Sequence, residues 1–182
     1  MDLVEAIRDR RSIRKYKTDP VSEKDLNTLL EAARWAPSWA NTQCVRWVVV
    51  KDPGLRAQLA ETLPGANPAY NAMKVVPVVL VACAVTGKAG FKKGEPTTDK
   101  GDWFLFDVAL AAQNLTLAAH AIGLGTVHVG LMDAGKAEEI LGVPEGVRVV
   151  EFIPLGYPDE SPNGPGRNEL SEIVFHEKYG QS

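Results

Sequence analysis

The spacing of apolar residues predicts helices at the start of the chain and between short strands. Residues 1–8 form a mixed amphipathic segment that favours a short helix. Ser22 is suited to cap a clearer helix, because acidic residues follow in the first turn and Pro37 marks its end. Apolar residues recur on one face of that helix at Leu26, Leu29, Leu30 and Ala33. Two shorter helices are predicted over residues 55–62 and 70–75.

Short runs of β-branched and apolar residues predict four strands, at residues 47–50, 76–85, 126–130 and 147–155. The second run is apolar throughout, with Pro77 at its start, and therefore predicts a strand buried on both faces. Asp133 is predicted to cap a helix that ends at Leu141. Residues 87–100 are polar and contain glycine, which indicates a mobile surface loop.

Residues 102–122 form the longest apolar segment, about as long as a membrane span of ~20 residues. Five polar residues interrupt it: Asp102, Asp107, Gln113, Asn114 and His120. A carboxylate inside a bilayer is costly, so we interpret the segment as the buried central helix of a globular core and not as a membrane span. Gly123 and Gly125 suit a left-handed cap at the carboxyl end of this helix.

The order of these elements predicts a single α+β layered domain over residues 1–182. Residues 158–167 are rich in proline and glycine and are too irregular to build a core. Residues 170–175 then alternate like a strand. An arm of this kind cannot bury its apolar end locally, so we expect it to cross onto a partner subunit.

Composition excludes several classes of protein. The hydrophobic fraction of 45% and the charged fraction of 24% are near globular averages, which argues against disorder. A net charge of -3 without a run of lysine or arginine argues against nucleic acid as a partner. The first residues do not resemble a secretion signal, so we expect a cytoplasmic protein. Cys44, Cys83 and the three histidines lie at no metal-ligand spacing, and no metal site is predicted.

A cluster of cations follows the first helix, at residues 10–16. Guanidinium groups pair bidentately with phosphate oxygens, and Ser12 adds a neutral donor, so the cluster suits a phosphomonoester. The alternative is a solvated basic helix end that interacts with the helix dipole. Arg167 is isolated in the Pro/Gly segment, with Glu169 as its one nearby carboxylate in the sequence.

A second cluster, at residues 36–43, follows the second helix. Its hydroxyl and amide groups could bind the polar edge of a planar heterocycle while Trp39 covers the face. The alternative is an ordinary connection in which Ser38 and Asn41 supply turn hydrogen bonds.

Five segments, in this order, resemble the FMN-dependent nitroreductase family. They read RRSIRKY, APSWANTQ, DVALAAQNLTLAAHAIGLGTVHVG, VVEFIPLGYP and, in the tail, GR-x-ELSEIVF. Single motifs of this kind are weak, whereas five in order over nearly the whole chain are highly specific. The resemblance implies a central, mainly antiparallel sheet flanked by helices, FMN at the interface of a homodimer, and a C-terminal arm that extends onto the partner subunit.

The resemblance also implies which residues contact the flavin. The phosphate and ribityl chain would be held by Arg10, Arg11, Ser12 and Arg14. From the other subunit, the flavin would be reached by Pro37, Ser38, Trp39, Asn41 and Gln43. A backbone N–H directed at flavin N5 would come from Gly130, flanked by Val129 and Leu131. The pocket would be completed by Leu155, Gly156 and Arg167. Some relatives place further flavin contacts at the positions of Asn71 and Lys74.

The implied activity is hydride transfer from NAD(P)H through FMN to nitroaromatics, quinones or activated alkenes, by a ping-pong mechanism. The cofactor carries this chemistry, so no catalytic nucleophile is required. Arg14 could stabilise charge that develops on the flavin pyrimidine. The chain departs from relatives that have Pro-Trp after the second motif, because Cys44 and Val45 stand there. Two alternatives are a dehalogenase or flavin-cleaving enzyme of the same fold and a non-catalytic flavin-binding or sensor dimer.

Overall fold

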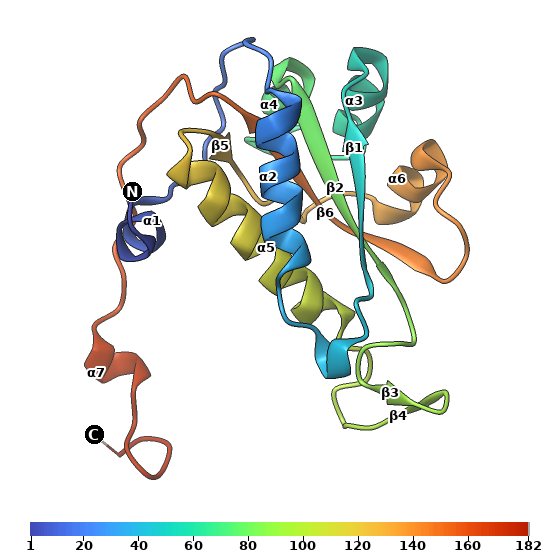
Figure 1. Cartoon of the computed structure of the whole chain (residues 1–182), viewed down its shortest axis with the longest axis vertical. Coiled ribbons are helices and arrows are strands. Elements are labelled where there is room, and N and C mark those ends of the chain that lie inside the picture. Colours follow the sequence, from blue (N-terminus) through green and yellow to red (C-terminus); the bar gives the residue numbers. More distant parts are fainter. Residues whose placement is uncertain (182) are drawn as a thin grey trace.

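A four-stranded antiparallel sheet forms the centre of the protein (Figure 1). The computed structural model describes residues 1–181. The strands lie in the order β1 (Val45–Val50), β2 (Val78–Val85), β6 (Val147–Gly156) and β5 (Gly125–Thr126). Helices flank this sheet, so the predicted α+β class and the mainly antiparallel sheet are confirmed.

Strand β2 is buried along almost its whole length, because β1 and β6 pair with its two edges and helices cover both faces. Its side chains alternate between two core clusters. Val79 and Val81 belong to one cluster, whereas Val78 and Leu80 belong to the other. The prediction of a strand buried on both faces is confirmed.

The helices form two layers, one on each face of the sheet. Helices α2 (Glu23–Arg34) and α5 (Phe104–Ala121) pack against each other and against the Leu80 face. Helices α3 (Pro53–Ala60), α4 (Tyr70–Val75) and α6 (Ala134–Leu141) cover the face of Val79 and Phe152. Each fully buried large apolar side chain contributes about 1.5–3 kcal/mol, so these two layers stabilise the sheet. Helix α1 (Leu3–Asp9) lies beside α5.

The predicted caps at Ser22 and Asp133 are confirmed, whereas α1 and α3 each begin two residues from the predicted start. The Ser22 side chain accepts a hydrogen bond from the backbone N–H of Asp25, and Asp133 accepts one from Lys136. The predicted central helix is α5, which begins two residues later than expected. Among the helices within residues 1–181, none combines the length and apolar character that a membrane crossing requires.

The structure corrects the predicted role of Gly125. Gly123 has the left-handed conformation expected of a helix cap, with φ of 85°, whereas Gly125 lies in β5. A Cβ at Gly125 would lie 2.9 Å from Cγ1 of Ile13, so close approach of the N-terminal segment is the reason for glycine there. The strand predicted over residues 126–130 is also shorter, because pairing beyond Thr126 consists of one bridge between Val129 and Phe152.

The prediction of a strand at residues 170–175 is wrong. This segment contains the short helix α7 (Leu170–Ile173), which Glu169 and Glu172 close by reciprocal capping hydrogen bonds. No neighbouring strand within residues 1–181 pairs with the segment, so local capping determines its conformation. The arm extends away from the sheet (Figure 1) and exposes Leu170 and Ile173.

The segment predicted as a loop at residues 87–100 contains a small hairpin, formed by β3 (Phe91–Lys92) and β4 (Glu95–Pro96). Left-handed Lys93 and Gly94 form its turn. Trp103 anchors the hairpin, because its backbone N–H donates to Ala89 and its indole N–H donates to Thr98. The surface position was predicted; the strand pairing was not.

Candidate functional site

The basic segment after α1 is fixed by its apolar residues. Ile13 and Tyr16 are buried, and the Tyr16 hydroxyl donates to the Ile13 carbonyl at 2.6 Å. The backbone N–H of Ile13 donates to the Thr126 carbonyl at 2.9 Å, and Ser12 forms a parallel bridge with Thr126. This pairing extends the β5 edge of the sheet, while Arg14, between the two buried residues, stays exposed.

The Pro/Gly-rich arm folds back over this segment. A carboxylate oxygen of Glu160 accepts hydrogen bonds from the backbone N–H groups of Arg14 and Lys15. Further along the arm, Gly164 lies against the Arg11 guanidinium, where an added Cβ would come within 2.6 Å of an Arg11 nitrogen. The Glu160 side chain therefore holds the arm on the basic segment, and glycine at position 164 permits the close approach to Arg11.

Together these segments enclose a cavity of about 200 Å³, here named the arginine cavity. Its lining residues are Arg10, Arg11, Ser12, Arg14, Pro162, Asn163, Pro165 and Arg167. Burial lowers the pKa of Arg10, and the nearby Arg11 and Arg167 guanidinium groups add to this effect by repulsion. Within residues 1–181, no carboxylate lines the cavity. A concentration of positive charge with serine and amide donors is suited to an anion with several oxygens.

The structure thus brings Arg167 to the four residues predicted from the first motif. It also adds Asn163, which the sequence analysis did not select. An asparagine within a Pro/Gly-rich segment usually supports a turn, so the sequence did not distinguish Asn163 from the other residues of this loop.

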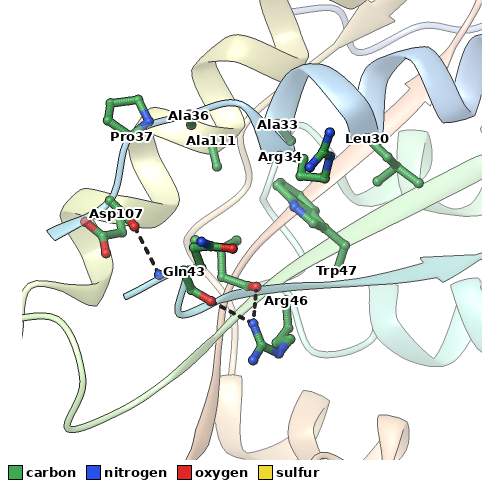
Figure 2. A pocket seen from close by; sticks show the side chains of 12 residues that line it. Leu30, Ala33, Arg34, Ala36, Pro37, Gln43, Arg46, Trp47, Asp107 and Ala111 are labelled. Atoms are coloured by element: carbon green, nitrogen blue, oxygen red, sulfur yellow. Dashed lines mark hydrogen bonds between the residues drawn. The ribbon is translucent and has the colours of Figure 1, made fainter. Parts of the chain in front are cut away.

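The second predicted cluster forms the Trp39 loop, which we define as residues 37–44. A cavity of about 250 Å³ lies between this loop, α2, α5 and β1 (Figure 2). Its lining residues are Leu30, Ala33, Arg34, Ala36, Pro37, Ser38, Gln43, Val45, Arg46, Trp47, Asp107 and Ala111. The Ser38 hydroxyl accepts the Gln43 N–H at 3.0 Å, and Arg46 donates to the carbonyls of Gln43 and Val45, each at 2.8 Å.

The backbone of the Trp39 loop is strained. Three residues other than glycine have left-handed conformations, namely Ala40 (φ 43°), Asn41 (φ 56°) and Gln43 (φ 49°). Such conformations persist where the surrounding structure enforces them. The Trp39 ring also packs against Trp103, with 4.9 Å between centroids, which joins the loop to the hairpin segment.

Asp107, in the first turn of α5, holds this loop and was not selected as a site residue from the sequence. It is 1% exposed, and its carboxylate accepts the backbone N–H of Trp39 at 2.9 Å. The Cys44 sulfur lies 3.3 Å and the Thr42 hydroxyl 3.5 Å from the other oxygen. Burial raises the pKa of Cys44 to about 12, and the bond to Asp107 adds to the rise, so Cys44 donates as a thiol at neutral pH.

The remaining predicted contacts fall into two groups. Val129 is buried, whereas Gly130 and Leu131 are exposed after β5. Leu155 and Gly156 are buried at the end of β6, where Gly156 lies against Pro77 and Tyr16. Strand β6 pairs with β5, and β5 pairs with the segment at Ser12, so the end of β6 lies near the arginine cavity. Since Leu155 and Gly156 are buried, they would contact a ligand there through their backbone atoms.

Helix α4 carries the other two predicted residues. Asn71 is exposed, but the Lys74 ammonium is already engaged within the chain. It lies 2.7 Å from a Glu61 oxygen and 2.7 Å from the Tyr70 hydroxyl. The bond from Lys74 lowers the pKa of Glu61, and the bond from Tyr70 adds to this effect. A ligand that uses Lys74 must therefore compete with an existing ion pair.

The basic segment after α1 and the Trp39 loop lie toward opposite ends of α5 (Figure 1). Asp107, in the first turn, contacts the loop, whereas His120, in the last turn, lines a second cavity together with Arg10 and Arg11. Thirteen residues of helix separate these two positions, a distance of about 20 Å at 1.5 Å per residue. Within one chain, the two predicted clusters therefore do not share one small site.

Metal chemistry has no support from the geometry of the described part of the chain. Across residues 1–181, no group of three or more His, Cys, Asp or Glu side chains could hold an ion. His128 instead pairs with Glu151, with 2.8 Å between Nδ1 and the carboxylate.

Comparison with known proteins assigns a family to this arrangement. The model of the family described as the nitroreductase family matches residues 7–157. A Methanothermobacter thermautotrophicus protein, whose name combines NADH dehydrogenase and NAD(P)H nitroreductase, is 35% identical over 89% of this chain and 80% of its own. FMN reductase [NAD(P)H] of Bacillus subtilis is 30% identical over 97% of this chain and 74% of its own.

A solved structure shows the same fold. The NADPH:FMN oxidoreductase from Vibrio harveyi, complexed with NAD+, superposes with a TM-score of 0.81 and 28% sequence identity. The superposition covers 99% of this chain and 79% of that one.

Proposed function

Because this chain belongs to the nitroreductase family, we propose that it is an FMN-dependent oxidoreductase that uses NAD(P)H to reduce small electron-poor molecules. The arginine cavity carries this proposal. Four arginines are among the residues that line it, which suits a phosphate, and a phosphate is the group that distinguishes FMN from free riboflavin. The similarity to proteins named for FMN and NAD(P)H supports the same cofactor and co-substrate here.

The residues of the arginine cavity fit this cofactor. Arg10, Arg11, Arg14 and Arg167 would neutralise the phosphate, and Ser12 would donate a neutral hydrogen bond. When bound, FMN would supply the redox chemistry that links NAD(P)H to the acceptor. The part of the protein is to bind, to orient and to stabilise charge. The exposed turn at Gly130 provides a backbone N–H suited to orienting the ring edge, as the family resemblance implies.

We further propose a homodimer in which the partner's Trp39 loop completes each flavin site. The separation of about 20 Å along α5 supports this arrangement, because one chain holds its loop away from its own arginine cavity. Exposed apolar residues on α1 and the arm, such as Leu3, Ile7, Leu170 and Ile173, provide a surface for the second subunit.

Light scattering tests this assembly. A dimer with more than about 2,000 Å² of buried surface is expected, as in obligate interfaces. A monomer with full flavin occupancy would contradict the proposal. The single domain and the cytoplasmic location remain predictions.

The mechanism proposed for this site is ping-pong, with NAD(P)H and the acceptor using the same flavin face in turn. The sequence contains no dinucleotide-binding glycine fingerprint, so a separate nicotinamide domain is not expected. Trp39 and the segment at residues 87–100, which contains the hairpin, would shape the shared face, since Trp39 packs on Trp103 at the base of the hairpin. The acceptors proposed are nitroaromatics, quinones and activated alkenes.

Steady-state kinetics with NADH and a quinone test this function. Parallel double-reciprocal lines are expected, and Trp39→Ala should change the acceptor preference more than it changes FMN retention. Intersecting lines would contradict a shared face. Flavin binding without NADH oxidation would favour a binding or sensor dimer, and activity confined to a halogenated or flavin substrate would favour a specialised enzyme of the same fold.

A further inference from the structure

Asp107 is a buried carboxylate whose hydrogen-bond partners come mainly from one segment of chain. It is 1% exposed and is the one carboxylate of the largely apolar helix α5, in whose first turn it lies. A carboxylate so placed is costly unless donors surround it. Its donors are the Trp39 N–H, the Thr42 hydroxyl and the Cys44 thiol, all from the Trp39 loop more than 60 residues away in sequence.

The loop conformation depends on such an attachment. Ala40, Asn41 and Gln43 all have positive φ, a conformation that non-glycine residues rarely keep without external support. Asp107 binds the chain on both sides of Ala40 and Asn41, at Trp39 and at Cys44. The carboxylate therefore closes the loop at its two ends, while the Ser38–Gln43 bond closes it internally.

The same contact controls the position of an aromatic ring. The hydrogen bond that the Trp39 backbone N–H donates to Asp107 fixes the backbone at Trp39, and the Trp39 ring packs on Trp103, which immediately precedes α5. The start of α5 thus contacts the loop at two places: Asp107 binds its backbone, and Trp103 packs against the Trp39 ring. Displacement of the loop from Asp107 would separate the two rings.

We propose that Asp107 is a positioning residue, which holds the Trp39 loop in its strained form and so sets the affinity of the flavin site for its two substrates. The expected change in substrate affinity rests on the proposed function, whereas the expected change in the conformation of the Trp39 loop does not. Cys44 contributes to this attachment, because its thiol donates to Asp107 from the carboxyl end of the loop. The thiol contact depends on the cysteine that this chain has at position 44.

The test compares Asp107→Asn with the wild-type protein. The amide oxygen can still accept from Trp39, but its NH2 group cannot accept from the Cys44 thiol. Two coupled indole rings produce a circular-dichroism couplet, which is measurable without flavin. The couplet should fall to less than about half, and the KM values for NADH and quinone should rise about tenfold, as expected for a lost buried hydrogen bond. The dissociation constant for FMN should change less than about threefold, because the arginine cavity is untouched.

Four further variants separate positioning from general stability. Asp52→Asn removes a carboxylate that caps α3 through the Leu55 N–H at 2.7 Å, and it should change neither the couplet nor the KM values. Trp103→Phe should abolish the couplet and so identify its source. Cys44→Ser retains a donor and should resemble the wild type, whereas Cys44→Ala should shift both measurements in the direction of Asp107→Asn.

The outcomes distinguish this inference from the proposed function. A wild-type couplet and wild-type KM values in Asp107→Asn would overturn the role of Asp107 while leaving the flavin enzyme intact. Should the wild-type protein bind no FMN, the proposed function fails, yet the couplet of the flavin-free protein still tests the attachment. Should Asp107→Asn fail to fold, the contrast between Cys44→Ser and Cys44→Ala decides, and equal behaviour of that pair would refute the inference.

Discussion

The arginine cavity and the Trp39 loop differ in where their charged groups find partners. In the loop, the Asp107 carboxylate is surrounded by donors from the same chain. In the arginine cavity, the cations lie beside one another, and Arg11 and Arg167 donate to neutral backbone carbonyls. The charged group of the loop thus has its hydrogen-bond partners within the chain, whereas the positive charges that line the cavity would be balanced by a bound anion. The first arrangement is therefore suited to positioning residues, and the second is suited to binding an anion, as proposed above.

Substitution of Asp107 should have the largest effect on stability. Asp107→Ala leaves the Trp39 N–H and the Cys44 thiol without their acceptor in a buried place, so the free energy of unfolding should fall by about 2–3 kcal/mol. Arg10→Ala should leave the free energy of unfolding unchanged or raise it, because the substitution removes a cation that Arg11 and Arg167 repel. Urea unfolding of both flavin-free variants measures the difference, and equal losses would remove the distinction between the two regions.

Substitution in the arginine cavity should instead reduce flavin binding. Arg14→Ala and Arg167→Ala should each weaken FMN binding by about 1.5–3 kcal/mol, the value of a charge-assisted hydrogen bond. Fluorescence titration of the flavin-free protein measures the dissociation constant. Arg148→Ala is a matched control, because that arginine pairs with Glu138 outside the cavity. Unchanged affinity in both cavity variants would mean that the cluster is a solvated surface.

The two cysteines give a smaller effect that depends on pH. Burial raises the pKa of Cys44 to about 12 and that of Cys83 to about 11 in the folded protein, from 9.0. The unfolded chain therefore loses these thiol protons first. The associated stability is present below pH 9 and is lost as the pH rises from 9 to about 11 for Cys83 and from 9 to about 12 for Cys44. Urea unfolding between pH 8 and 10.5 should show a steeper loss for the wild type than for the Cys44→Ala, Cys83→Ala double variant; parallel profiles would contradict this.

The smallest effect is expected at Gly164. A Cβ there would displace the Arg11 guanidinium, whose hydrogen bonds to the Arg8 and Arg10 carbonyls would lengthen. Since a side chain can move more easily than backbone, Gly164→Ala should change stability by less than about 1 kcal/mol. FMN affinity should fall a few-fold, which the same titration measures. Gly166→Ala is the control, because a Cβ there meets no atom within 4 Å.

Local sequence signals predicted much of the fold. The caps at Ser22 and Asp133 depend on neighbouring residues, and the burial of β2 depends on an unbroken apolar run, so both were readable from the chain. The segment at residues 170–175 was misassigned because alternation indicates a possible strand but not whether a partner strand exists. Close approach to Ile13, which explains Gly125, is likewise a tertiary property.

The candidate site shows the same limit. The first motif indicated Arg10, Arg11, Ser12 and Arg14, but only the fold brings Arg167 and Asn163 to them. From the sequence, Asp107 was interpreted only as a polar residue that argues against a membrane span. Its role depends on a loop more than 60 residues away, and a single carboxylate in an apolar helix gives no indication of its partner.

Titration of the flavin-free protein with FMN and with riboflavin tests the central claim most directly. The two ligands share the ring and ribityl chain and differ in the phosphate, so their ratio of affinities isolates the contribution of the arginine cavity. The account predicts one FMN per chain, a yellow protein, and binding of FMN about 100-fold or more tighter than riboflavin, equivalent to ~2.7 kcal/mol or more. Equal affinities, or no binding of either flavin, would contradict it.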